Sequence, residues 1–270
     1  MNDDAGIWIQ GAGELASGVG CRLVRCGYRV VMAEVATPLA VRRLVCFSEA
    51  VRTGSVVIEG VTGRLATPSE ASWRRGEVTV IVAPGGDQMD RLSPDVVVDA
   101  RMTKGAPDPL PRGAAPLIGL GPGFRCGEDA DLIIETHRGT RLGAVIDSGQ
   151  ALADTGVPGA VGGATSSRLL RAPCAGYLAP QCAIGDLARA GDTIGTVDGR
   201  PIRAEIAGLI RGLISPDVEL FAGMKVGDID PRGAAINPGL VLDKALAIAG
   251  GVLEGLLRLG ARPVPPGAEN

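Results

Sequence analysis

The chain has 270 residues and a formal net charge of −3, with 46% hydrophobic and 21% charged residues, a balance typical of folded globular domains. No basic run exceeds two residues, so we expect no nucleic-acid partner. No apolar run approaches the ~20 residues of a membrane helix and the start is acidic, so we expect a cytoplasmic protein. A single histidine and six cysteines without a C-x-x-C pair exclude the common zinc spacings, and we predict no metal site.

The N-terminal segment predicts a dinucleotide-binding βαβ unit. A short apolar run at residues 7–10 predicts a strand, and the sequence G-A-G-E-L-A-S-G at residues 11–18 predicts a tight loop that opens a helix. A second apolar strand is predicted at residues 29–34 and ends in an acid. This order of elements is typical of Rossmann-like domains. A βαβ unit whose glycines serve only the turn is the alternative interpretation.

The residue types in this unit fit a bound nucleotide. Gly11 fits a tight turn, Gly13 lets a pyrophosphate approach the backbone, and Ala16 is small enough for the helix to pack on the strand. Glu34 lies 21 residues after Gly13, where an acid accepts a hydrogen bond from a ribose hydroxyl group. Glu14 suits the helix dipole but competes with a pyrophosphate, so we expect it to contact a metal held by the ligand or to point aside.

The rest of the first half predicts a parallel sheet that is covered on both faces. Apolar strands are predicted at residues 78–83, 95–100, 116–120 and 130–135. Because ligands bind beyond the carboxyl ends of such strands, we expect the loops that follow them to converge on one crevice. The loops in question are at residues 11–18, 84–87, 99–104 and 121–124. The candidate ligand-binding residues are Gly11, Gly13, Glu14, Ala16, Glu34, Asp99, Lys104, Gly121 and Gly123.

The second half contains a repeat at an offset of 32 residues. Residues 171–200 align without a gap to residues 203–232, and nine of the thirty positions are identical. Each half predicts several short strands, and two halves that face each other bury one shared core. The wording of the repeat resembles biotinyl/lipoyl hybrid modules, which carry their cofactor on a lysine at a hairpin tip. The matching stretch at residues 198–203 reads D-G-R-P-I-R and has no lysine, so we expect neither biotin nor lipoate and predict a docking or structural module.

These patterns predict an α/β protein with four parts. We expect a Rossmann-like nucleotide-binding domain at residues 1–148, a glycine-rich linker at 149–168 and a duplicated β barrel-sandwich hybrid at 169–235. Residues 236–262 are expected to form a C-terminal helix that packs back on the body. Its apolar face is predicted from Leu246, Ala249, Val252, Leu253, Leu256 and Leu257.

Several phrases, taken together and in order, resemble one family. They include G-A-G-E-L-A-S-G near the start, P-L-A-V-R-R-L-V-C-F-S-E-A-V, D-V-V-V-D-A, L-G-P-G-F, I-I-E-T-H-R-G and G-M-K-V-G-D-I-D-P-R. The chain is similar to the YqeB-type accessory proteins of the selenium-dependent molybdenum hydroxylase system, whose enzymes are related to xanthine dehydrogenase. The resemblance implies a maturation role. Positions that match the family motifs add Arg42, Arg43, Ser48, Glu49 and Glu135 to the candidate residues above.

Three functional hypotheses follow. The first is an accessory protein that binds a nucleotide-bearing ligand, such as a molybdopterin dinucleotide, and docks to a molybdenum hydroxylase or its maturation proteins. The second is an NAD- or FAD-dependent oxidoreductase, for which no catalytic residues are apparent. The third is a non-catalytic docking scaffold. Homo-oligomerisation is compatible with each of them.

Overall fold

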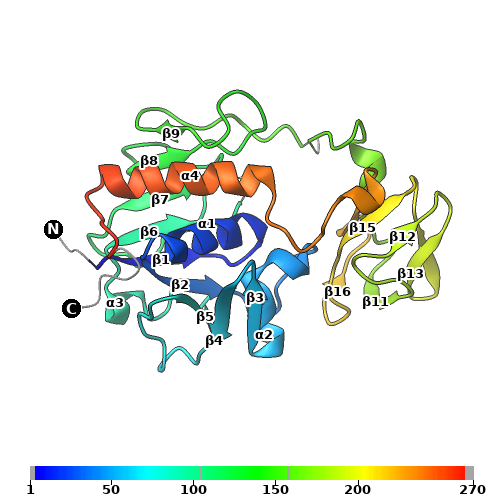
Figure 1. Cartoon of the computed structure of the whole chain (residues 1–270), viewed down its shortest axis with the longest axis horizontal. Helices are drawn as coiled ribbons and strands as arrows, with labels where there is room; N and C mark the ends of the chain where they lie inside the picture. The colour runs from blue at the N-terminus through cyan, green and yellow to red at the C-terminus, as the bar shows by residue number, and fades with distance from the viewer. Residues whose placement is uncertain (1–3, 104, 157–158, 265–270) are drawn as a thin grey trace. The chain divides into compact units, whose positions relative to one another are not determined.

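The computed structural model describes residues 4–103, 105–156 and 159–264, which fold into two compact units (Figure 1). The first unit comprises Met1–Ala36, Cys46–Asp154 and Val241–Asn270. The second comprises Thr37–Val45 and Thr155–Leu240. Within the described residues, no helix has the length and apolar character needed to cross a membrane.

The first unit is built on a mixed sheet of nine strands in the order β3-β4-β5-β2-β1-β6-β7-β8-β9. The seven strands from β4 to β8 in this order are parallel, and the outer strands β3 and β9 run antiparallel to their neighbours. The predicted parallel sheet is therefore correct for the interior, and the sheet as a whole is mixed. The strands are β1 (Gly6–Gln10), β2 (Arg29–Glu34), β3 (Ser55–Ile58), β4 (Val61–Leu65), β5 (Glu77–Val82), β6 (Val96–Asp99), β7 (Leu117–Leu120), β8 (Leu132–Ile134) and β9 (Val145–Ile146).

The antiparallel edge at β3 arises from a hairpin. Glu59 and Gly60 connect β3 to β4 with φ values of 44° and 84°. Positive φ at both central residues is the backbone of the two-residue turns that suit twisted antiparallel strands. A connection this short cannot make the crossover that parallel neighbours require, so β3 must run antiparallel to β4.

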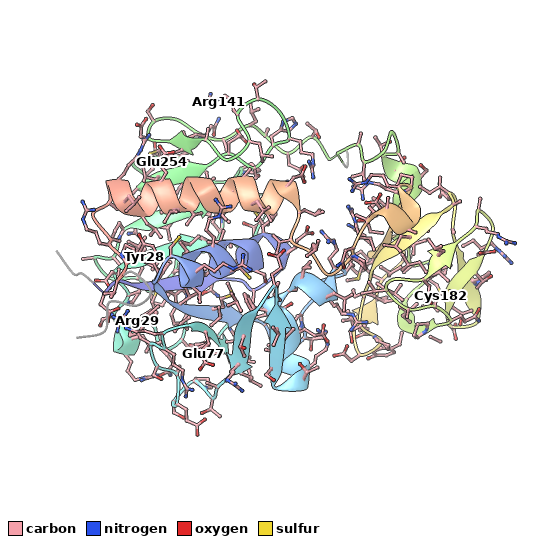
Figure 2. All side chains as sticks on the ribbon, viewed as in Figure 1. Tyr28, Arg29, Glu77, Arg141, Cys182 and Glu254 are labelled. Carbon is pink, nitrogen blue, oxygen red and sulfur yellow. The ribbon has the colours of Figure 1, made fainter. Side chains whose placement is uncertain are left out.

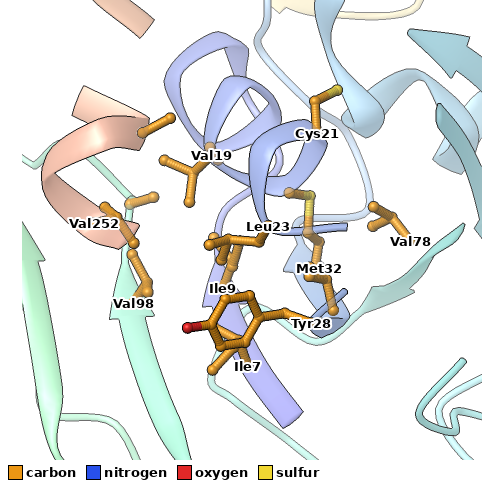
Figure 3. Packing of buried hydrophobic residues seen from close by; sticks show 14 of the residues in the cluster. Ile7, Ile9, Val19, Cys21, Leu23, Tyr28, Met32, Val78, Val98 and Val252 are labelled. Atoms are coloured by element: carbon orange, nitrogen blue, oxygen red, sulfur yellow. The ribbon is translucent and has the colours of Figure 1, made fainter. Parts of the chain in front are cut away.

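Two long helices cover one face of this sheet. α1 (Glu14–Arg25) and α4 (Asp243–Arg258) lie side by side (Figure 1), and α4 is the predicted C-terminal helix. Ile7 and Ile9 of β1 share one buried cluster with Val19 of α1 and Val252 of α4 (Figure 3). The Tyr28 hydroxyl group, at the start of β2 (Figure 2), donates a hydrogen bond of 3.0 Å to a backbone carbonyl group that follows α4. This face of the sheet therefore holds both the N-terminal unit and the C-terminal helix.

The opposite face of the sheet is covered by loops and short helices. Trp8 alternates with Ile7 and Ile9 along β1 and belongs to a second buried cluster with Ile81 and Phe124. Because both faces are buried, the interior strands are apolar throughout. The short helices are α2 (Ala50–Thr53) and α3 (Met89–Leu92), with single 3₁₀ turns at Arg43–Val45, Phe47–Glu49, Ser166–Arg168 and Gly233–Ala235.

The thiol of Cys21 makes the stability of the first unit depend on alkaline pH. Cys21 is 2% exposed, and burial raises the pKa of its thiol from 9.0 to about 12. Above pH 9 the unfolded thiol loses its proton while the folded one keeps it. The folded state then binds more protons, and its stability falls as pH rises, by about 1.4 kcal/mol per pH unit until about pH 12.

We expect Cys21→Ala to flatten this pH dependence. Urea unfolding followed by tryptophan fluorescence reports on the first unit, because Trp8 and Trp73 both lie there. The slope of unfolding free energy between pH 9 and 10.5 is expected to become shallower by about 1 kcal/mol per pH unit in the variant. Cys174→Ala, in the second unit, is the control. An unchanged slope in Cys21→Ala contradicts the assignment.

The second unit consists of two four-stranded antiparallel sheets that interleave the repeat. One sheet has the order β10-β17-β15-β12 and the other β14-β13-β11-β16. Each strand from β10 to β13 has its counterpart 32 residues later, in β14 to β17, and the counterparts always lie in opposite sheets. The strands are β10 (Leu169–Arg171), β11 (Gly176–Pro180), β12 (Leu187–Ala188), β13 (Thr193–Val197), β14 (Arg200–Arg203), β15 (Gly208–Leu213), β16 (Glu219–Leu220) and β17 (Lys225–Asp230).

The core of the second unit obeys the same repeat. Positions that are equivalent by the offset of 32 are buried in both halves and share one cluster. These pairs are Leu170 and Ile202, Leu178 and Ile210, Ile194 and Val226, and Val197 and Ile229. The two halves therefore complete one common core, and neither sheet is built from one half alone.

A short segment from early in the chain completes this unit. Residues 37–45, predicted to belong to the first domain, lie in the second unit. The backbone oxygen of Val41 accepts a hydrogen bond of 2.7 Å from Leu213 N. Arg42 is 4% exposed and donates to Leu240 O at 3.2 Å, and Arg43 donates to Leu213 O at 2.9 Å. These two arginines therefore anchor backbone carbonyl groups inside the second unit.

Candidate functional site

The order of strands in the first unit reverses at β1. The chain leaves β1 towards β2 on one side, and returns on its other side at β6, from which it continues to β7 and β8. Gln10, at the end of β1, is in register with Ala33 of β2 and Asp99 of β6. The three strands thus end at one level. Open parallel sheets bind ligands at such a switch point, beyond the carboxyl ends of the strands.

The glycine loop lies at this switch point. Gly11 has a φ of 101° and donates to Ala33 O at 2.7 Å, and a Cβ atom here would lie 3.1 Å from Ala100 O. A side chain at Gly11 is therefore disfavoured by both conformation and space. Gly13 caps α1 with a φ of −71°, and a Cβ atom there would meet no atom within 4 Å. The open space beside Gly13 lies at the start of α1, where backbone N–H groups favour an anion.

Glu34 holds the glycine loop from the end of β2. One carboxylate oxygen accepts a hydrogen bond of 2.9 Å from Ala12 N, and the other accepts one of 2.8 Å from Val35 N. A carboxylate has about four acceptor positions, so both oxygens retain the capacity to accept a further hydrogen bond. Ala16 is 1% exposed within α1, which agrees with a packing role for its small side chain.

Asp99 and Arg101 form a bidentate pair at the end of β6. Asp99 is 2% exposed, and its carboxylate accepts hydrogen bonds from Arg101 Nε at 3.0 Å and from Arg101 N at 3.1 Å. Both residues line a pocket of about 200 Å³, to which Phe124 and Arg112 contribute. The aspartate thus fixes the guanidinium group, and Arg101 is a positively charged group that lines the pocket. Lys104, the other charged residue predicted here, lies outside the described residues.

The two glycines after β7 allow neighbouring loops to approach closely. Gly121 has a φ of 78°, and a Cβ atom there would lie 2.5 Å from Thr136 Oγ1. Gly123 has a φ of 105°, and a Cβ atom would collide with Gly105 O. Both positions therefore require glycine for packing of the loops that follow β6, β7 and β8, whether or not a ligand is bound.

A group of charged residues that the sequence did not predict as a set gathers beside the start of α1. Glu135 follows β8, is 2% exposed, and accepts hydrogen bonds from His137 N at 2.7 Å and from Leu152 N at 2.9 Å. Lys244, in the first turn of α4, is half-buried. Burial and the charge of Arg138 lower the pKa of Lys244, against the opposing effect of Glu14, Glu135 and Asp154. These residues are near enough to influence one another electrostatically.

No preformed metal centre accompanies this site. In the part of the chain that the structure describes, no three histidine, cysteine or acidic side chains are placed to hold a metal ion. Cys126 donates a weak hydrogen bond to Asp131 O at 3.2 Å. Burial, together with Asp147 and Asp131, raises the pKa of this thiol, which makes it a poorer nucleophile near neutral pH.

These features define an α/β protein with a Rossmann-like glycine loop at a sheet switch point and a separate, duplicated β unit. The chain is 44% identical over 256 residues, 94% of its length, to the uncharacterized protein YqeB of Escherichia coli strain K12. Over this length it is a YqeB-type protein, and it spans about half (47%) of that relative. No protein-family model matches the chain.

Solved structures show only weak similarity. An aspartoacylase family protein from Mesorhizobium loti is 25% identical over 24% of this chain and 23% of that chain, with a TM-score of 0.22. The apo ectoine utilization protein EutE from Ruegeria pomeroyi is 10% identical over 84% of this chain and 86% of that chain, with a TM-score of 0.25. TM-scores this low do not establish a shared fold.

Proposed function

We propose that the first unit binds a nucleotide-bearing ligand at the switch point between β1 and β6. The observation that carries this proposal is the glycine loop, where Gly11 is required by the backbone and Gly13 borders open space at the start of α1. A phosphate group placed there meets the N–H groups of the first helical turn. Glu34 stands at the end of β2, where an acid contacts a ribose.

The protein is further proposed to be an accessory protein in the maturation of selenium-dependent molybdenum hydroxylases. Support comes from the similarity to YqeB-type proteins across nearly the whole chain, together with a site suited to a dinucleotide. A dinucleotide form of the molybdenum cofactor has the phosphates and ribose that this site fits. In a strain that lacks the protein, selenium-dependent hydroxylase activity is expected to be lost, and normal activity contradicts the maturation role.

A redox cofactor is the second candidate ligand, favoured by the position of Glu34. An acid at this place accepts ribose hydroxyl groups of NAD or FAD and repels the additional phosphate of NADP. An oxidoreductase is then expected to bind NADH or FAD and to change its absorbance on turnover. Tight binding of cytidine nucleotides with no affinity for NADH or FAD favours the maturation role.

Substitution of Gly13 tests the binding site. Gly13→Val places a side chain in the open space beside the loop without a clash with the protein, so we expect the fold to survive. Binding of cytidine diphosphate, NAD or FAD, measured by calorimetry, is expected to weaken at least about tenfold. Gly250→Ala, on α4, where the new methyl group meets only the end of the Arg22 side chain at 3.4 Å, is the matched control. Equal affinities in the two variants contradict a site at the loop.

The second unit is proposed to be a barrel-sandwich hybrid of the biotinyl/lipoyl type that acts as a docking module without a cofactor. The support is the interleaved pairing of its two halves and the tight turn at Asp198 and Gly199, whose φ values are 49° and 73°. That turn joins β13 to β14, at the junction of the two repeats, and residues 198–203 offer no lysine for attachment. Intact-mass measurement of protein from its native host is expected to show no added biotinyl or lipoyl group.

A further inference from the structure

Lys244 lies at the same edge of the sheet as the glycine loop. It follows Asp243 in the first turn of α4, and Asp243 binds Arg138, after β8, with two contacts of 3.1 and 3.0 Å. The next residue, Ala245, packs against α1 so closely that a Cβ atom at Gly18 would lie 2.8 Å from Ala245 Cβ. The first turn of α4 is therefore held between the beginning of α1 and the loop that follows β8.

The groups that surround Lys244 are mostly acidic. Glu14 approaches from α1, Glu135 from the end of β8 and Asp154 from the end of the first unit, and all three favour the charged form of Lys244. Arg138, which opposes it, is already paired with Asp243. Among the described residues, none forms an ion pair with the Lys244 ammonium group within 4.0 Å. The ammonium group is thus half-buried in an acidic surrounding with its hydrogen-bonding capacity largely unused.

A phosphate at the glycine loop needs a cation in this setting. Glu14, in the first turn of α1, repels an anion placed over Gly13, and the buried carboxylate of Glu135 adds to this repulsion. A lysine ammonium group is a compact charge that suits a phosphate oxygen. Only three of the 27 basic residues are lysines, namely Lys104, Lys225 and Lys244. Lys225 lies in β17 of the second unit, and Lys104 is outside the described residues.

We propose that the Lys244 ammonium group binds the phosphate of the ligand held over the glycine loop, with Glu14 and Glu135 orienting it. This inference rests on the nucleotide-binding function proposed above and names the group that supplies its positive charge. It assigns a ligand-binding role to α4, more than two hundred residues away from the glycine loop in sequence.

The choice of lysine gives the interaction a pH signature. Burial lowers the pKa of Lys244, so the ammonium group loses its proton at a lower pH than an exposed lysine does. Affinity for a phosphate-bearing ligand is therefore expected to fall as pH rises above neutral. Arginine stays charged over this range, so Lys244→Arg is expected to bind with little dependence on pH.

Calorimetric titration with cytidine and cytidine diphosphate tests the proposal. Lys244→Gln is expected to weaken binding of cytidine diphosphate about 10- to 100-fold at pH 7, while leaving the affinity for uncharged cytidine unchanged. Lys244→Arg is expected to restore binding and to remove its decline at alkaline pH. Equal losses for both ligands, or an unchanged affinity for cytidine diphosphate, overturn the inference.

Magnetic resonance gives a second readout. Reductive methylation with ¹³C-formaldehyde labels the three lysines, and Lys244→Arg assigns one signal by its absence. Cytidine diphosphate is expected to raise the pKa measured from the Lys244 signal. If the diphosphate binds while this signal does not respond, the role of Lys244 fails and the proposed function stands. If the wild-type protein binds neither cytidine diphosphate, NAD nor FAD, the proposed function fails and the inference fails with it.

Discussion

Replacing Arg211 by alanine is expected to destabilise the second unit by about 3–5 kcal/mol, the usual effect of breaking a buried ion pair. Arg211 is 4% exposed, and its guanidinium group donates to Asp228 Oδ2 at 2.9 Å and to Asp230 Oδ2 at 3.1 Å. Arg168 binds the other oxygen of Asp228, and Arg232 binds Asp230 at 2.8 Å. Loss of the central arginine leaves two buried carboxylates with one partner each.

The charge network also departs from the repeat, which makes it separable from the shared core. By the offset of 32 residues, Ala179 occupies the position of Arg211 and Thr196 that of Asp228. The expected effect is therefore confined to the contacts of β15 and β17. It can be measured by hydrogen exchange of peptides from residues 200–232 in increasing urea.

Arg171→Ala is the matched control for this prediction. Arg171 is exposed on β10 of the same sheet and donates to Gly223 O at 2.8 Å, so its loss is expected to cost less than about 1 kcal/mol. Equal losses in Arg171→Ala and Arg211→Ala contradict a stabilising role of the buried network.

The adjacent glycines of α4 are expected to respond in opposite directions to alanine. At Gly251, a Cβ atom would collide with Gly143 O and lie 2.9 Å from Ile134 Cγ2. Because backbone blocks the space, Gly251→Ala must displace α4 from the loop before β9, at an expected cost of about 2–3 kcal/mol. At Gly250, the nearest atom is the mobile end of Arg22, so Gly250→Ala is expected to stabilise the helix by about 0.5–1 kcal/mol.

Urea unfolding of the two variants, followed by fluorescence of Trp8 and Trp73, measures both effects in the same unit. The comparison isolates packing, since each variant adds one methyl group to the same helix. Equal stability changes contradict the close approach of α4 and the loop at Gly143.

The first βαβ unit was predictable from local patterns, whereas the sheet edges were not. The apolar runs and the glycine loop determine β1, α1 and β2 within a few residues, because each depends on neighbours in sequence. β4 reads V-T-G-R-L, with a glycine and an arginine that obscure its strand character. Gly63 is explained only by tertiary packing, since a Cβ atom there would collide with the Phe47 ring. Likewise, the path of residues 37–45 into the second unit rests on long-range contacts.

The candidate site divides in the same way. The sequence predicted residues that follow β1, β2, β6 and β7, since parallel strands bring their carboxyl ends together. It predicted Asp99 as a ligand-facing charge, whereas the structure shows its carboxylate bound by Arg101, two residues further on. Lys244 carries no local signal at all. Its place beside the glycine loop depends on the docking of α4 against α1, where Gly18 lets Ala245 approach.

Identification of the bound small molecule tests the central claim most directly. The protein is purified from a strain that produces a molybdenum hydroxylase and then denatured, and the released compounds are identified by mass spectrometry, with Gly13→Val purified in parallel. A molybdopterin dinucleotide that is released by the wild-type protein and absent from the variant is the predicted result. Wild-type protein that releases no nucleotide-bearing compound, and that remains unable to bind one when it is supplied, contradicts the account.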